Sequence, residues 1–252
     1  MSDSTIVLIT GVTRGIGKAL LQAYLSRPNH TVIGTVRSIA SPDSESLQSS
    51  PTAPGSRLLL FQLESSNAND YPNLVSKLEF SGIKHLDIVI PNAGISTTPS
   101  PLATVSIDDV TSAFEVNTVG TLRLYQAVRY LLEKSPGGKP KWVSMSSGAG
   151  SLACVEPFGT SAVSGYAMSK AAMNWITLAM HSSDKWLTAF AIHPGLVQTE
   201  MGNKGARAMG MEEAPNTIEE SITKTLATID GSTREATSGK FLNVIDGTEV
   251  PW

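Results

Sequence analysis

The sequence predicts an α/β domain with a mainly parallel, doubly wound sheet and helices on both faces. Short β-branched apolar runs alternate with segments of helical periodicity along most of the chain, which is typical of parallel strands joined by crossover helices. The first run, residues 5–9, is followed at once by a glycine-rich turn and then by a helical pattern. The 252 residues also have the length of one large domain, 1–252.

Composition predicts an ordinary soluble globular protein. The chain is 41% hydrophobic with a formal charge of −3, so no basic excess indicates nucleic acid or an anionic membrane as a partner. The single cysteine, Cys154, excludes an internal disulfide and favours a reduced compartment. Residues 1–4 lack a basic segment, and the apolar run after them ends at Thr10, too early for a signal peptide or a membrane span. We therefore expect a cytoplasmic protein.

The elements follow one another in the order that a doubly wound fold requires. Helical patterns cover residues 18–25, 71–80 and 106–133, and a capping box from Thr217 to Glu220 opens a further helix. Residues 38–56 are rich in serine and proline and are expected to form a flexible surface loop. Strands are predicted at residues 5–9, 31–36, 58–63, 86–90, 142–146, 189–193 and 241–245.

The turn after the first strand has the composition of a phosphate-binding loop. Gly11, Gly15 and Gly17 stand between a buried strand and a helix, where backbone N–H groups and the positive helix end would face a dinucleotide pyrophosphate. Their spacing, Gly-x-x-x-Gly-x-Gly, differs from the common dinucleotide fingerprint. An NTPase loop is excluded, because it would need glycine in place of Val12 and serine or threonine in place of Ala19.

The residues after the second strand favour NADPH over NADH. NAD-binding chains place an acidic residue here for the ribose diol, whereas this chain has Thr35 and Val36 followed by Arg37. Arg14 lies inside the glycine loop. Two guanidinium groups would suit a 2′-phosphate, which arginine can bind in a bidentate manner; the alternative is that both arginines are merely solvated.

A tyrosine and a lysine could form a proton-transferring pair. Tyr166 and Lys170 are four residues apart, so in a helix they share one face. A neighbouring ammonium group would lower the pKa of the phenol and make it a better acid–base catalyst. The spacing alone is weak evidence for catalysis, because tyrosine–lysine pairs at this spacing often just form a solvated helix surface. Ser147 at the end of the fifth strand and Asn117, a polar residue within an apolar helical stretch, accompany the pair.

Taken together, these motifs resemble the short-chain dehydrogenase/reductase family in its single-domain branch, with a Rossmann fold. Within that family the sequence is most similar to sniffer-type carbonyl reductases and to fungal norsolorinic-acid ketoreductase-like proteins, through residues 146–151 and 247–252. The motifs that carry the resemblance are Thr10-Gly11-x-x-x-Gly15-Ile16-Gly17, Asn92-Ala93-Gly94, Asn117, Ser147, Tyr166-x-x-x-Lys170 and Pro194-Gly195-x-Val197-x-Thr199.

The resemblance implies an NADPH-dependent carbonyl reductase with a tyrosine general acid. It implies that Tyr166 protonates the carbonyl oxygen, and that Lys170 lowers the pKa of Tyr166 and holds the nicotinamide ribose. Ser147 would stabilise the charge on the carbonyl oxygen, and Ser146 is the alternative serine for this role. Asn117 would order a water molecule linked to Lys170. The implied cofactor-binding residues are Gly11, Thr13, Arg14, Gly15, Ile16, Gly17, Arg37, Glu64, Asn92, Ala93, Gly94, Tyr166, Lys170, Pro194, Gly195, Val197 and Thr199.

The resemblance also implies a small-molecule carbonyl substrate and a homodimer or homotetramer. Three departures from the family pattern affect the site. Pro91 precedes Asn92 where the family has asparagine, and Glu64 stands where an aspartate usually meets the adenine. Ser147 and Tyr166 are nineteen positions apart, a longer spacing than the family's common one. The extra residues, 152–160, are expected to shape the substrate mouth, and residues 200–216, rich in glycine and methionine, are expected to form a substrate lid.

Two other functions remain open at the level of sequence. One is NAD(P)-dependent alcohol oxidation, and the other is a cofactor-binding Rossmann protein without turnover, for which Pro91 is the main indication. The four histidines are scattered and show no metal-ligand spacing, so no metal site is predicted. Cys154 is expected to belong to the pocket wall and not to act as a nucleophile. The resemblance to the family also implies an apolar carbonyl substrate.

Overall fold

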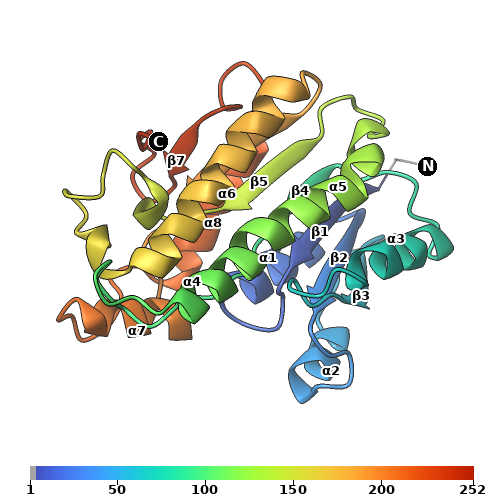
Figure 1. The fold of residues 1–252 in the computed structure, drawn as a ribbon. Coiled ribbons are helices and arrows are strands. Elements are labelled where there is room, and N and C mark those ends of the chain that lie inside the picture. The colour runs from blue at the N-terminus through green and yellow to red at the C-terminus, as the bar shows by residue number, and fades with distance from the viewer. Residues whose placement is uncertain (1–3) are drawn as a thin grey trace.

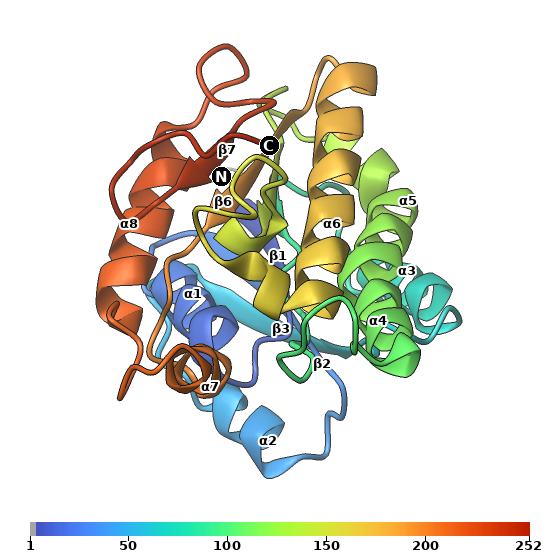
Figure 2. The same ribbon diagram turned by 60° about the vertical axis from the view of Figure 1, so that its left-hand side comes forward.

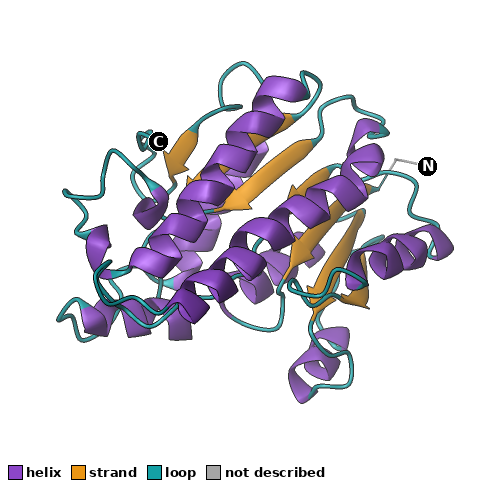
Figure 3. Ribbon diagram, viewed as in Figure 1, coloured by secondary structure: helices purple, strands orange, loops and turns teal. Residues whose placement is uncertain are grey.

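A seven-stranded sheet forms the centre of the molecule, and helices cover both of its faces (Figure 1 and Figure 3). The computed structural model describes residues 4–252. Every neighbouring pair in the sheet is parallel, in the order β3-β2-β1-β4-β5-β6-β7. The prediction of a doubly wound, mainly parallel sheet is therefore confirmed. The strands are β1 (Thr5–Thr10), β2 (His30–Val36), β3 (Arg57–Gln62), β4 (Ile88–Ile90), β5 (Lys141–Met145), β6 (Thr188–His193) and β7 (Phe241–Asn243).

The helices divide into two layers. In Figure 2, α1 and α8 lie on one side of the sheet, and α3, α5 and α6 lie on the other. The bounds are α1 (Gly15–Leu25), α2 (Pro42–Gln48), α3 (Asp70–Phe80), α4 (Ile107–Ala113), α5 (Gly120–Glu133), α6 (Ser164–Ser183), α7 (Glu200–Ala208) and α8 (Ile218–Gly231), with a π-helix η1 (Phe114–Val119) and 3₁₀ turns η2 (Gly148–Gly150) and η3 (Thr160–Ala162).

The two layers explain why the first strand is an uninterrupted apolar run. Ile6 and Leu8 pack into the core on the α3, α5 and α6 side, whereas Val7 and Ile9 pack into the core under α1 and α8. Successive side chains of a strand point to opposite faces. A strand covered on both sides must therefore be apolar at every position.

The segment expected to be a flexible loop, residues 38–56, contains a helix instead. The side chain of Ser41 accepts a hydrogen bond from the backbone N–H of Ser44, and Pro42 occupies the first turn of α2, where its missing N–H costs nothing. Leu47 anchors the helix and is 1% exposed. The loop prediction is therefore wrong for Pro42–Gln48, because one buried leucine and an N-terminal cap suffice to dock a largely polar helix.

The long helical pattern of residues 106–133 is present but is not one regular helix. The π-helix η1 lies between α4 and α5 and contains Asn117. Insertions of this kind are frequent at functional sites. The capping box at the start of α8 is half formed: the Thr217 hydroxyl accepts from the Glu220 N–H at 3.1 Å, while the Glu220 carboxylate accepts from Lys224 at 2.8 Å.

Four of the motifs follow the carboxyl ends of strands at one edge of the sheet. The glycine loop follows β1, Asn92 follows β4, Ser147 follows β5 and Pro194 follows β6. The strand order reverses between β1 and β4, and in open α/β sheets ligands bind at such a reversal. The topology thus brings together residues that are far apart in the chain.

Candidate active site

The glycine loop after β1 is held by side chains from the neighbouring strand. Gly11 has φ +70°, a backbone conformation that favours glycine. The Asn92 amide donates to the carbonyl oxygens of Thr10 at 2.9 Å and Gly11 at 3.1 Å. A Cβ atom on Gly17 would lie 2.2 Å from the Gly11 oxygen and 2.4 Å from the Asn92 Nδ2. The loop therefore closes tightly on α1 and on residue 92.

Proline at position 91 leaves this arrangement intact. The N–H groups of Asn92 and Ala93 both donate to the Thr10 hydroxyl, at 3.0 and 2.9 Å. The carbonyl of Pro91 accepts from the Met145 N–H at 3.4 Å. The bonds that tie the end of β4 to β1 thus involve the two residues after the proline.

The N-terminus of α1 is free to bind an anion. Its cap residue is Arg14, which makes no side-chain capping bond, and the first turn contains no acidic residue. Unpaired N–H groups at a helix start attract negative charge. The start of α1 could therefore hold an anionic group.

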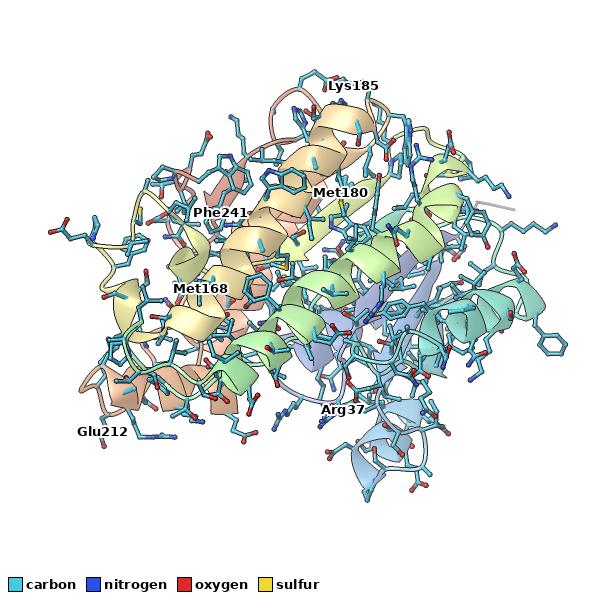
Figure 4. All side chains as sticks on the ribbon, in the orientation of Figure 1. Arg37, Met168, Met180, Lys185, Glu212 and Phe241 are labelled. Carbon is cyan, nitrogen blue, oxygen red and sulfur yellow. The ribbon has the colours of Figure 1, made fainter. Side chains whose placement is uncertain are left out.

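The two arginines expected to meet a 2′-phosphate lie in different surroundings. Arg14 forms an ion pair with Glu200 at the start of α7, and both side chains are largely exposed. Arg37 follows β2 at the carboxyl edge of the sheet, where Figure 4 labels it. Within residues 4–252, Arg37 makes no ion pair. Glu64, on the same side, accepts a hydrogen bond from Ser66 at 3.3 Å.

Asn117 fixes the segment that follows β4. Its Oδ1 accepts from the Ile95 N–H at 2.9 Å, and its Nδ2 donates to the Ile95 carbonyl and to the Ser169 hydroxyl, both at 2.9 Å. The residue is fully buried. The Asn117 side chain therefore connects residues 94–96 to α6, one residue before Lys170.

Of the two neighbouring serines, only Ser147 faces Tyr166. The Ser146 hydroxyl is buried and donates to Asn174 on α6 at 2.6 Å. The Ser147 hydroxyl is close enough to the Tyr166 phenol to influence its pKa, and it accepts from the Ala149 N–H at 3.2 Å. Successive residues of an extended chain point to opposite sides, which explains why Ser146 contacts Asn174 while Ser147 faces Tyr166.

Tyr166 and Lys170 lie on one face of α6, as the spacing predicts. The Lys170 Nζ is 5.7 Å from the centre of the Tyr166 ring and donates to the Met145 carbonyl at 2.7 Å. It is also close to Gly94, since a Cβ built there would be 3.7 Å away. The ammonium group thus lies between the end of β5 and the segment after β4.

The expected lowering of the tyrosine pKa is wrong for this structure. Burial raises the pKa of Tyr166, and the neighbouring Ser147 hydroxyl opposes that effect only in part. Burial also lowers the pKa of Lys170, to about 8. Both shifts arise because the two groups are removed from water, which disfavours their charged forms. Near neutral pH the phenol holds its proton and the lysine is still mostly charged.

The residues inserted between Ser147 and Tyr166 form an apolar rim beside Ser147. Phe158 is 50% exposed, and its ring approaches within 3.2 Å of the position that a Cβ on Gly148 would take. The C-terminal segment supports the rim, because the Ser151 hydroxyl donates to the Pro251 carbonyl at 2.5 Å and the Ala153 N–H donates to the Trp252 carbonyl at 3.1 Å. Cys154 is buried beneath it.

The residues after β6 lie against the glycine loop. The Thr199 hydroxyl caps α7 by accepting from the Gly202 N–H at 3.0 Å, and its methyl group is 3.2 Å from the Cβ position of Gly15. Helix α7 occupies residues 200–208 of the expected lid, and Met201, Met209 and Met211 are exposed around it. These contacts place α7 at the open edge of the candidate cofactor site.

Sequence reasoning missed several residues of this region. Asn174, Ser169 and Glu200 were not singled out, although they bind Ser146, Asn117 and Arg14. Asn174 and Ser169 share a helix with Tyr166, so their helical spacing was the only available signal. Glu200 gave none, since it is 186 residues from Arg14.

Comparison with known proteins identifies the family. The family model described as short chain dehydrogenase matches residues 5–209. The chain belongs to the short-chain dehydrogenase family. It is 45% identical to the short-chain dehydrogenase srdF of Neurospora crassa, and the alignment covers 100% of this chain and 99% of that protein. It is 38% identical to the norsolorinic acid ketoreductase nor1 of Dothistroma septosporum, and the alignment covers 100% of this chain and 94% of that protein. A crystal structure of NADPH-bound carbonyl reductase from chicken fatty liver superposes with a TM-score of 0.85 at 26% identity, covering 99% and 100% of the two chains.

These matches confirm the family predicted from the motifs and its likeness to fungal ketoreductases. The chain is accordingly an oxidoreductase of the short-chain dehydrogenase family. Between residues 4 and 252, no cluster of three or more potential ligands could hold a metal ion. In the same part of the chain, every helix is too short or too polar to cross a membrane.

Proposed function

We propose that this short-chain dehydrogenase reduces a ketone or aldehyde to an alcohol with NADPH, with Tyr166 as the general acid. The observation that supports this most directly is the grouping of Tyr166, Lys170 and Ser147: the Lys170 Nζ is 5.7 Å from the centre of the Tyr166 ring and Ser147 neighbours the phenol, beside the edge of the sheet that carries the glycine loop. The norsolorinic acid ketoreductase and the NADPH-bound carbonyl reductase among the similar proteins point the same way.

The residues at the candidate cofactor site fit NADPH. The uncapped start of α1 suits a pyrophosphate, and Arg14 and Arg37 provide positive charge for a 2′-phosphate. In this proposal Arg14 exchanges Glu200 for the phosphate. Ala93, Gly94, Pro194, Gly195, Val197 and Thr199 would line the nicotinamide half, and Thr13, Ile16 and Glu64 would line the other. When bound, NADPH supplies the hydride.

The protein's own residues would manage the proton and the charge on oxygen. Tyr166 holds its proton at neutral pH because burial raises its pKa, so it can donate to the carbonyl oxygen as negative charge develops there. The Ser147 hydroxyl, next to the phenol, would donate a second hydrogen bond to the same oxygen. Lys170 would keep the site positive, and Asn117 would hold the lysine's surroundings in place.

The rim of the site suits an apolar substrate. Leu152, Val155 and Phe158 of the insertion and Met201 of α7 are all at least 40% exposed. Exposed apolar side chains around a site are typical of binding surfaces. Self-association through the α5 and α6 layer, expected from the family, is part of the same proposal: Leu122 and Trp175 are 37% and 70% exposed on these helices.

A direct assay separates the proposed reductase from the other candidates. The protein would be mixed with NADPH and a panel of apolar ketones while nicotinamide absorbance is followed. We expect absorbance to fall in proportion to ketone consumed. A protein that only binds the cofactor would retain the signal, and an enzyme that works as an NAD-dependent alcohol dehydrogenase would turn over faster with NAD⁺ and alcohol.

Replacing Arg37 with aspartate is expected to weaken NADPH binding about tenfold to a hundredfold, because one charge-assisted contact with the phosphate is lost. The same change should improve turnover with NADH, since a carboxylate can bind the ribose diol. Lys185→Asp is the matched control: it makes the same charge change at the far end of α6 (Figure 4). If the wild type and Arg37→Asp had the same preference between NADPH and NADH, residues other than Arg37 would bind the 2′-phosphate.

The rate of reduction is expected to fall as the pH rises through about 8. Lys170 has its pKa lowered to about 8 by burial, so its ammonium form is present below this pH and is lost above it. The value of kcat/KM should be level at lower pH and then fall about tenfold per pH unit. Lys170→Arg, which stays charged, should move the fall upward. A profile that stays level until about pH 10, where an ordinary lysine titrates, would refute this role.

A further inference from the structure

The turn that carries Ser147 is bonded at both ends to one side chain of α6. The Ser146 hydroxyl donates to the Asn174 Oδ1 at 2.6 Å, and the Asn174 Nδ2 donates to the Gly150 carbonyl at 3.1 Å. Asn174 is 3% exposed, and both hydrogen bonds are buried. Such bonds are costly to break, because the freed groups cannot reach water. Residues 146–150, which we call the serine turn, are therefore fixed to the helix by a single amide.

The serine turn also packs on the part of α6 that holds the proposed catalytic pair. Asn174 is four residues after Lys170, so the two side chains lie on one face of the helix. A Cβ atom on Gly150 would lie 2.9 Å from the Lys170 Cβ and 3.0 Å from the Asn174 Nδ2. The serine turn thus lies directly against the helix turn between Lys170 and Asn174.

Hydrogen bonds inside the serine turn connect this anchor to Ser147. The Ser147 carbonyl accepts from the Gly150 N–H at 2.8 Å, and its hydroxyl accepts from the Ala149 N–H at 3.2 Å. The orientation of the Ser147 hydroxyl therefore depends on where Gly150 is held. That hydroxyl neighbours the Tyr166 phenol. By holding Gly150, Asn174 also determines how Ser147 lies relative to Tyr166.

We propose that Asn174 is a positioning residue: it holds the serine turn on α6, and so keeps the Ser147 hydroxyl in place to bond with the carbonyl oxygen that Tyr166 protonates. The inference rests on the proposed reductase function and extends it to a buried residue that acts only through Ser147. Catalysis is sensitive to such placement, since a displacement of about 1 Å can cost about a hundredfold in rate.

Asn174→Leu is expected to lower kcat for ketone reduction about tenfold to a hundredfold, because the side chain keeps its size but loses both hydrogen bonds. NADPH affinity, measured by fluorescence titration, should be unchanged. Thr177→Val is the matched control: it removes a buried hydrogen bond of 2.7 Å with Ser144, which also joins β5 to α6. Its kcat should equal that of the wild type. An unchanged kcat in Asn174→Leu, or an equal loss in Thr177→Val, would overturn the proposal.

A double-mutant cycle shows whether Asn174 acts through Ser147. Ser147→Ala should itself lower kcat about a hundredfold or more, since a donor to the carbonyl oxygen is lost. Adding Asn174→Leu to Ser147→Ala should then change kcat by no more than about twofold, because the group to be positioned is gone. A general loss of structure would instead lower kcat by the same factor in both backgrounds, and that result would refute the positioning role.

Asn174→Ser keeps the experiment possible if Asn174→Leu does not fold. The smaller side chain leaves space in which water can bond to the freed polar groups, so the fold should be retained. One hydroxyl is too short to bond with both Ser146 and Gly150, and kcat should still fall about tenfold. A wild-type kcat in this variant would count against the proposal.

Amide hydrogen exchange, followed by NMR, tests the proposal without turnover. If the wild type reduced no ketone, the proposed function would fail, but the constraint on the serine turn could still be measured. The Ala149 and Gly150 N–H groups should exchange about tenfold faster or more in Asn174→Leu, and at the wild-type rate in Thr177→Val. Equal exchange rates in the two variants would show that Asn174 does not hold the serine turn and would refute the proposal.

Discussion

Tyr166→Phe is expected to reduce turnover about a hundredfold to ten-thousandfold, the range over which general acid catalysis contributes. The substitution removes only the phenolic hydroxyl, which neighbours Ser147, and the ring keeps its size within α6. NADPH affinity, measured by fluorescence titration, should therefore be unchanged. Turnover is measured as ketone-dependent oxidation of NADPH under saturating conditions.

A second tyrosine provides the matched control. Tyr130 on α5 donates to Glu79 at 2.9 Å on the surface of the molecule, so Tyr130→Phe also removes one phenolic hydroxyl. Its turnover should equal that of the wild type. Near-normal turnover in Tyr166→Phe would show that the carbonyl oxygen receives its proton from another group.

The positions of the main site residues could be predicted because they follow the ends of strands. In a parallel sheet the carboxyl ends of neighbouring strands share one edge, so Gly11, Asn92, Ser147 and Pro194 had to come together once the strands were recognised. The i, i+4 spacing of Tyr166 and Lys170 was equally readable. These inferences need only the chain order and the periodicity of each element.

Contacts between distant segments could not be predicted in this way. The ion pair of Arg14 with Glu200 and the bond from Ser151 to Pro251 join residues 186 and 100 positions apart, and no periodicity links them. The π-helix around Asn117 was also hidden, because its apolar pattern is that of an ordinary helix.

Burial was the other quantity that the sequence did not reveal. The Tyr166 pKa was expected to fall beside Lys170, yet desolvation raises it. Likewise, the buried Leu47 docks α2 in a segment whose serines and prolines predict a loop. In both cases the deciding factor is how much water the surrounding fold excludes.

Gly17→Ala is expected to damage both stability and cofactor binding, because the new methyl group has no space. It would lie 2.2 Å from the Gly11 oxygen and 2.4 Å from the Asn92 Nδ2, within the contact that holds the glycine loop. Overpacking of this kind lowers the free energy of unfolding by about 1–3 kcal/mol. The displaced loop should also weaken NADPH binding about tenfold or more, since loss of one to two hydrogen bonds has that effect.

The control for this change is a glycine in another helix with open space around it. Gly231 ends α8, and no atom lies within 4 Å of its Cβ position. Gly231→Ala should leave NADPH affinity unchanged and slightly raise the unfolding temperature, since alanine favours helix by up to about 1 kcal/mol. Thermal unfolding and NADPH titration of both variants give the answer. If Gly17→Ala and Gly231→Ala had the same unfolding temperature and the same NADPH affinity, the prediction would be wrong. The close approach of α1 to the Gly11 carbonyl would then not determine the shape of the cofactor site.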